Sequence, residues 1–157
     1  GTIQSLWDAN MDMLGATNPE GINVYDKEWQ IFARNPIRPP HITGSSAVIK
    51  DSLVTDGCKI YGEVDHSVLF HSVVVEKGAT VKDSVIMPNT VIKAGAVVDH
   101  AIVAENVVIS VAVQVGVPAE DGNTGVVVVA EGVELKPGVK IPYGTMCTES
   151  PKGRDEE

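Results

Sequence analysis

Three histidines, His66, His71 and His100, are the first residues of this 157-residue sequence that could do chemistry. Imidazole nitrogens bind Zn²⁺ and also serve as general bases. Two kinds of enzyme site therefore have to be weighed, a three-histidine metal site and a histidine-dependent acyl-transfer site. Which of them is possible depends on whether the fold brings these side chains together.

A second group of candidates is cationic. Arg34 and Arg38 flank Pro36 in the segment RNPIRPP, and Lys50 follows nearby. Clustered guanidinium and ammonium groups bind phosphate groups well, so these three residues are our candidates for binding a phosphorylated metabolite effector. Arginines that are solvated or paired within the chain are an equally good interpretation.

Composition excludes several functions. The net charge is −9, with 12 Lys and Arg against 21 Asp and Glu and no basic run, so we expect no nucleic-acid partner. No apolar stretch is long enough for a membrane-spanning helix. Cys58 and Cys147 lie among apolar residues, which favours core thiols in a reducing, cytoplasmic compartment. The sequence has no nucleophile elbow, phosphate-binding glycine loop or CxxC pair, and we expect no catalytic residue, resident metal or cofactor in this chain.

The apolar composition favours β structure. The chain has 26 Val and 12 Ile but only 5 Leu, and 25 of the Val lie at Val48 or later. β-branched side chains lose rotamer freedom in helices and pack well on sheets. We therefore expect a mainly β fold that begins shortly before Val48.

An internal repeat specifies which β fold this is. Residues 62–78, 79–95 and 96–112 align with a constant period of 17, after a shorter unit that begins at Lys50. Short periods of this kind indicate a solenoid, here with three faces in each coil. Five apolar columns agree across the repeat, and we expect them to fill a narrow prism: Val64/Val81/Val98, Val68/Val85/Ile102, Leu69/Ile86/Val103, Val74/Val91/Val108 and Val75/Ile92/Ile109.

The C-terminal segment shows a six-residue unit directly. Gly132, Gly138 and Gly144 recur every six residues, where they would supply left-handed corner conformations. Leu135, Ile141 and Cys147 follow in phase and are expected to point inward. Between the two blocks, residues 116–125 are predicted to be an excursion loop.

Two polar columns run beside the apolar ones. The first is Lys50, Asp65, Lys82 and Asp99, and the second is Asp51, His66, Asp83 and His100. Stacked coils place equivalent residues about 4.8 Å apart, so each column would alternate in charge or potential charge. We hypothesise two corner ladders of ion pairs that fix the register of the coils, each exposed pair contributing about 0.2–1 kcal/mol.

The ladder argues against a metal site. His66 and His100 would lie two coils apart, roughly 9–10 Å, with Asp83 between them, whereas nitrogen ligands of one zinc ion each lie about 2.0–2.1 Å from the metal. We interpret these histidines as members of the ladder. An acyltransferase remains an alternative, although no residue beside any of these histidines is diagnostic of one.

The N-terminal part differs in character. Residues 2–14 have helical apolar spacing after Thr2, a plausible N-cap, and are expected to pack on their own domain, because Asp8 and Asp12 disfavour an anionic membrane. Proline-rich residues 15–41 read as an extended linker with a short strand candidate at Trp29 to Ala33. The solenoid is expected over 42–148, followed by an acidic tail over 149–157.

Several segments, taken together, resemble one enzyme family. GTIQSLWDANMDML, NPIRPP, KDSLVTDGCKIYGEV and DSVIMP are similar to the C-terminal part of bacterial glucose-1-phosphate adenylyltransferases, also called ADP-glucose pyrophosphorylases. The most specific pieces are DSVIMP at 83–88 and SLW-x-ANMD at 5–12, and the resemblance is close over residues 1 to about 109. It implies a left-handed parallel β-helix of the hexapeptide-repeat type, preceded by one α-helix and an extended linker.

The resemblance also implies a function. Enzymes of this family make ADP-glucose and pyrophosphate from ATP and glucose 1-phosphate, with Mg²⁺, for glycogen synthesis. The resemblance implies that a catalytic domain precedes Gly1, that the helix at 1–14 is its end, and that this chain alone does not catalyse. The β-helix would contact that domain, assemble a homo- or hetero-tetramer, and take part in allosteric control by a metabolite.

Some positions depart from the pattern of plant relatives. An effector-binding Asp-Lys pair appears as Ala104 and Glu105 here, and a second effector lysine is replaced near Val129 or Ala130. These differences put plant-type activation by 3-phosphoglycerate in doubt. The alternative function is a stand-alone hexapeptide-repeat enzyme, either an acyltransferase or a γ-type carbonic anhydrase.

Overall fold

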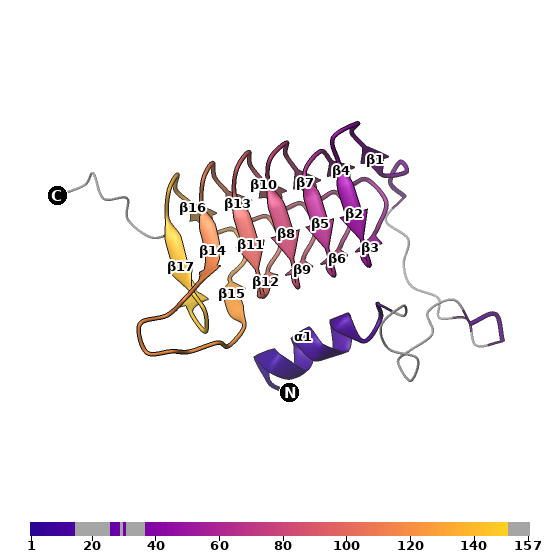
Figure 1. Cartoon of the computed structure of the whole chain (residues 1–157). Helices are drawn as coiled ribbons and strands as arrows, with labels where there is room; N and C mark the ends of the chain where they lie inside the picture. Colours follow the sequence, from indigo (N-terminus) through magenta and orange to yellow (C-terminus); the bar gives the residue numbers. More distant parts are fainter. Residues whose placement is uncertain (15–25, 29, 31–36, 151–157) are drawn as a thin grey trace.

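The structure is a computed structural model that describes residues 1–14, 26–28, 30 and 37–150. In these residues one helix, α1 (Ile3–Met11), precedes short strands that form three parallel six-stranded sheets (Figure 1). Sheet A contains β1 (Ile42–Thr43), β4 (Lys59–Ile60), β7 (Val74–Val75), β10 (Val91–Ile92), β13 (Val108–Ile109) and β16 (Glu134–Leu135). Sheet B contains β2 (Val48–Lys50), β5 (Glu63–Asp65), β8 (Thr80–Lys82), β11 (Val97–Asp99), β14 (Gln114–Val117) and β17 (Lys140–Pro142). Sheet C contains β3 (Leu53–Val54), β6 (Val68–Leu69), β9 (Val85–Ile86), β12 (Ala101–Val103), β15 (Val127–Val129) and β18 (Met146–Cys147).

Each coil contributes one strand to each sheet, which makes a β-solenoid of about 6 turns and confirms the predicted fold class. The strand register confirms the period of 17, because Val91 pairs with Val74 on one side and with Val108 on the other. One early coil is shorter by two residues, since Lys50 pairs with Asp65.

Fewer apolar columns line the interior of the prism than the sequence predicted. Three columns point inward, those of Val64, Leu69 and Val75, and their members are fully buried. The columns of Val68 and Val74 point outward instead, which corrects the expectation that all five fill the prism. Successive side chains of a strand lie on opposite faces, so neighbours such as Val68 and Leu69 cannot both point inward.

Left-handed backbone conformations make the corners. The hexad glycines Gly132, Gly138 and Gly144 have φ of 71°, 75° and 73°, as their spacing predicted. Leu135, Ile141 and Cys147 are buried in phase with them.

The N-terminal helix packs on the solenoid. Thr2 caps α1 by accepting a hydrogen bond from the Ser5 amide at 3.1 Å, and the helix ends at Met11, three residues before the expected end. Met11 and Leu14 are buried against the column of Val68, Val85 and Ile102 on the outer face of sheet C. In Figure 1, α1 accordingly lies along the sheet that contains β6, β9 and β12. The helix therefore packs on sheet C of the same chain.

Other expectations concern segment bounds. Strand β14 contains Gly116 and Val117, so the excursion loop begins after Val117 rather than at Gly116. The strand candidate at 29–33 and most of the linker and tail lie outside the described residues. Cys58 and Cys147 are buried free thiols, as predicted, and burial raises the pKa of both. Among the described helices, none is long and apolar enough to cross a membrane.

Candidate functional site at the ladder corner

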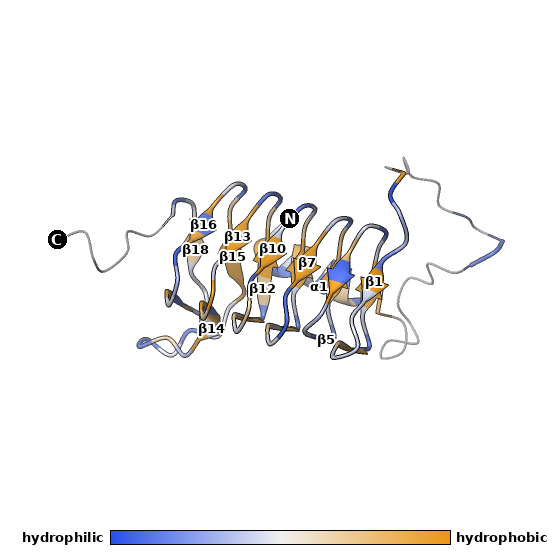
Figure 2. Cartoon of the chain, turned by 90° about the horizontal axis from the view of Figure 1, so that it is seen from above, coloured by the Kyte–Doolittle hydropathy of each residue, from blue (hydrophilic) through white to orange (hydrophobic). Residues whose placement is uncertain are grey.

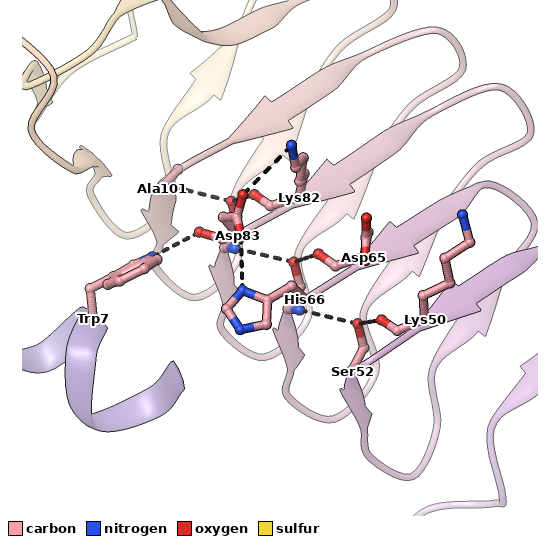
Figure 3. A network of polar contacts seen from close by, with 10 residues as sticks. Trp7, Lys50, Ser52, Asp65, His66, Lys82, Asp83 and Ala101 are labelled. Carbon is pink, nitrogen blue, oxygen red and sulfur yellow. Dashed lines mark hydrogen bonds and ion pairs between the residues drawn. The ribbon is translucent and has the colours of Figure 1, made fainter. Parts of the chain in front are cut away.

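The corner where sheet B passes into sheet C gathers the polar columns found in the sequence. We call it the ladder corner and define it by the second column, whose φ values lie between 40° and 50°: Asp51, His66, Asp83 and His100. The first column comes one residue earlier, in strict register along sheet B: Lys50 with Asp65, Asp65 with Lys82, and Lys82 with Asp99. Both columns therefore lie along one corner (Figure 3).

The ion pairs differ from those that the ladder hypothesis expected. Within the described residues, no ion pair joins two members of the first column; Lys50 Nζ lies 4.0 Å from Glu63 Oε1. In the second column, His66 Nδ1 lies 2.7 Å from Asp83 Oδ1, and Lys82 Nζ lies 3.9 Å from Asp83 Oδ2. Long lysine side chains can reach diagonal neighbours on the sheet face, as Lys50 does with Glu63. The two columns meet at Asp83, which is near both His66 and Lys82.

A ladder of serine hydroxyls stands directly beneath these charges. Ser52, Ser67 and Ser84 each donate to the carbonyl oxygen two residues earlier, at 2.6–2.8 Å. Each hydroxyl also accepts the amide of its equivalent in the next coil at 3.1 Å, and the ladder ends at Ala101. The serines recur with the spacing of the charged columns, 15 residues and then 17, and this repetition is the signal that could have identified them.

Trp7 fastens the helix to this corner. Its indole Nε1 donates to the Asp83 carbonyl oxygen at 2.7 Å, and its ring meets His100 edge-on, with centroids 4.7 Å apart. His100 is therefore not paired with Asp83 but lies between the rings of Trp7 and Tyr143. The sequence marked Trp7 only as an apolar residue of the helix, since nothing in local spacing points to a residue 76 positions away.

Tyr143 contacts Asp99, the last residue of the first column. Its hydroxyl donates to Asp99 Oδ2 at 2.5 Å, and this bond raises the pKa of Tyr143 to about 12. Gly116 lies between them, with φ of 89°, and a Cβ there would lie 2.9 Å from Tyr143 Cε1 and 2.2 Å from the Asp99 carbonyl oxygen. A glycine at this position lets the tyrosine pass over strand β14 to reach Asp99.

The remaining candidates lie elsewhere. His71 is in the turn between sheet C and sheet A, and its Nδ1 is buried without a hydrogen-bond partner. Exposed Arg38 has its Cβ beside Gly57 at that same corner, whereas Lys50 lies at the ladder corner. The structure therefore does not bring these two cations to one corner, and Arg34 lies outside the described residues.

The two departures from the plant pattern come together in space. The Ala104 amide donates to the Val129 carbonyl oxygen at 2.9 Å, so these positions lie in adjacent coils. Glu105 beside them is exposed, Val129 is buried and Ala130 is partly buried. None of these four side chains is cationic.

The ladder corner is not arranged as a metal centre. Over residues 1–14, 26–28, 30 and 37–150, no three His, Cys, Asp or Glu side chains form a group that could hold a metal ion. The His66–Asp83 pair is half-exposed and lies next to α1. Trp7 contacts the Asp83 backbone beside this pair, so α1 docks next to the pair and not on its side chains.

Comparison with known proteins agrees with this architecture. A family model described as "GlmU-like, C-terminal hexapeptide" matches residues 40–135, which is more than half of the chain. The chain belongs to this family. The hexapeptide repeat named in this family's description agrees with the solenoid of three parallel sheets.

Several curated relatives of this chain are glucose-1-phosphate adenylyltransferases. Glucose-1-phosphate adenylyltransferase of Clostridium perfringens (strain SM101 / Type A) is 50% identical over 84 residues, which are 54% of this chain and 21% of the relative. The enzymes of that name from Clostridioides difficile (strain 630) and Bacillus subtilis (strain 168) are 49% and 47% identical over 84 and 81 residues. The matched part spans about a fifth of the length of these relatives.

Proposed function

We propose that this chain is the regulatory and oligomerisation domain of a glucose-1-phosphate adenylyltransferase. The parent enzyme would make ADP-glucose and pyrophosphate from ATP and glucose 1-phosphate for glycogen synthesis in the cytoplasm, and the solenoid alone would not catalyse. The relatives' name and the small share of their length that this chain matches support this proposal. Mg²⁺ would belong to the catalytic domain, and no residue of this chain is assigned to it.

One observation carries the regulatory part of the proposal: Trp7 docks α1 on the ladder corner through Asp83 and His100. A catalytic domain that continues into α1 would be held on the outer face of sheet C, so a shift of the helix changes contacts with His100 and with the Asp83 backbone. Asp83 in turn holds His66 and lies near Lys82. The corner would therefore couple the solenoid to the catalytic domain.

The effector in this proposal is a phosphorylated metabolite. Arg34, Arg38 and Lys50 stay candidates for binding it, and the uncharged Ala104, Val129 and Ala130 favour an effector other than that of plant enzymes. The expected parent is a tetramer of identical or related subunits.

The test uses the full-length product of the gene that encodes this chain. We expect release of pyrophosphate from ATP and glucose 1-phosphate, and we expect Trp7→Ala to change the response to phosphorylated metabolites more than the activity without them. A full-length product without a nucleotidyltransferase domain, or without this activity, would overturn the proposal. Stoichiometric bound metal, or a thermal shift with coenzyme A, would favour the carbonic anhydrase or acyltransferase alternative.

A further inference from the structure

Sheet A carries an apolar stripe that no described segment covers. In register across the six strands, its outward residues are Ile42, Lys59, Val74, Val91, Val108 and Glu134. The three valines are partly exposed and the two charged residues are exposed. Figure 2, seen from above, shows β7, β10 and β13 as a hydrophobic band along the solenoid.

The other two faces differ from this one. Sheet C is covered by α1, whose Met11 and Leu14 bury its central valines. Sheet B presents the charged first column of the ladder corner. Sheet A is therefore the apolar face that remains open in the described residues.

The order of residues from β4 to β16 is self-complementary. Lys59 and Glu134 flank three valines with Val91 in the middle, and exposed Ile42 on β1 extends the stripe beyond Lys59. A twofold axis that lies in the interface, parallel to β10, would reverse the solenoid direction of a second copy. Lys59 of one copy would then face Glu134 of the other, Val74 would face Val108, and Val91 would face itself.

We infer that sheet A is a face through which two copies of this chain pair antiparallel, with Val91 on the twofold axis. The inference rests on the assembly role proposed above and names the surface and the occupant. At the edge of the stripe, Lys93 lies two residues after Val91 and would face Lys93 of the other copy near the axis, with the Glu76 carboxylate of each copy one coil away. Glu134 also has Lys136 of its own chain at 3.3 Å, and a carboxylate can accept both cations.

A charge-swap series tests the pairing. In sedimentation velocity over a concentration series, Lys59→Glu and Glu134→Lys should each weaken dimerisation roughly tenfold or more, because like charges then face each other. The double variant restores opposite charges and should recover most of the loss. Lys140→Glu, which makes the same charge change on sheet B, is the matched control and should leave the dimer unchanged.

A second measurement does not depend on charge. Packed sheets lie about 10 Å apart, so a short bis-maleimide should crosslink two copies of Val91→Cys but not of Val97→Cys, an outward valine on sheet B. If the chain self-associates, but the charge swaps do not weaken the dimer and Val91→Cys does not crosslink, then sheet A is not the interface and the assembly role survives. If the chain and the full-length product are both monomeric, the inference and the assembly role both fail.

Discussion

At the scale of single residues, Trp7 joins the N-terminal helix to two coils of the solenoid. It is a partly buried residue of a short helix, yet it contacts the backbone of Asp83 and the ring of His100 in different coils. Neither contact follows from helical spacing. A single indole therefore sets where α1 lies along the solenoid.

We predict that Trp7→Phe lowers the free energy of unfolding by about 1 kcal/mol or more, since it keeps an aromatic ring, although a smaller one, and removes the donor to the Asp83 carbonyl oxygen. Urea denaturation followed by circular dichroism measures the difference. Leu6→Ala is the control, because Leu6 is 46% exposed on the same helix and its loss should cost less than about 0.5 kcal/mol. Equal effects of the two substitutions would contradict the docking role of Trp7.

Tyr143 predicts a pH dependence. Its hydrogen bond to Asp99 favours the neutral phenol, and the pKa rises from 10.0 to about 12. The stabilisation is therefore complete below about pH 10 and is lost as the pH rises towards 12. Ultraviolet titration of phenolate should show one late tyrosine, which Asp99→Asn moves back towards 10.0 and Tyr143→Phe removes; identical curves for wild type and Asp99→Asn would contradict the assignment.

At the scale of elements, the serine ladder ties successive coils together beneath the charged residues. Ser67→Ala should leave the buried Ser84 amide without its acceptor and cost about 1–3 kcal/mol of unfolding free energy. Ser46→Ala removes one exposed hydrogen bond to the Tyr61 carbonyl oxygen and should stay within about 0.5 kcal/mol. Thermal and urea denaturation measure both variants. Equal stabilities of Ser67→Ala and Ser46→Ala would mean that the serine ladder contributes nothing to stability.

The corner between sheets A and B gives a matched pair of backbone predictions. Gly95 and Ala112 occupy equivalent positions in adjacent coils, with φ of 70° and 56°. A methyl group at Gly95 meets no atom within 4 Å, so Gly95→Ala should cost about 1 kcal/mol from the left-handed backbone alone. Ala112→Gly should stabilise the fold by about 0.5–1 kcal/mol, because the relief of strain exceeds the added chain entropy of the unfolded state. Denaturation experiments should give changes in unfolding free energy of opposite sign for the two variants, and changes of the same sign would contradict the prediction.

The strands show which features were predictable from the sequence. The period of 17 placed the central coils in register, since each of them repeats the same Val and Ile positions. The period did not distinguish inward from outward columns, because Val68 is as apolar as Leu69. Val68 is apolar although it points outward because α1 covers it. An apolar residue on an outer face is the local sign of a covering partner.

At the scale of the whole molecule, the polar columns were predictable but the site that they form was not. Register alone aligns Asp83 with His66 and His100. The helix that docks there and the tyrosine that crosses over Gly116 come from outside the repeat, at separations of 76 and 44 residues that are not multiples of 17. Contacts between a repeat and the segments around it depend on tertiary packing, which periodicity does not encode.

The molecule also has two apolar cores that share the strands of sheet C on opposite faces. One fills the prism, and the other lies between α1 and the column of Val68, Val85 and Ile102. In a solenoid each coil is stabilised mainly by its neighbours, so the inner core should survive without the outer one.

We predict that Met11→Asp undocks α1 while the coils stay folded, because Met11 is 7% exposed in the outer core and absent from the inner one. The variant should keep its β-sheet circular dichroism, bind a hydrophobic dye, and lose amide-exchange protection in α1 alone. Ile3→Asp, on the same helix at a 40% exposed position, should do none of these. Cooperative loss of the β signal together with the helix would mean instead that the two cores fold as one unit, and that α1 is a structural part of the solenoid.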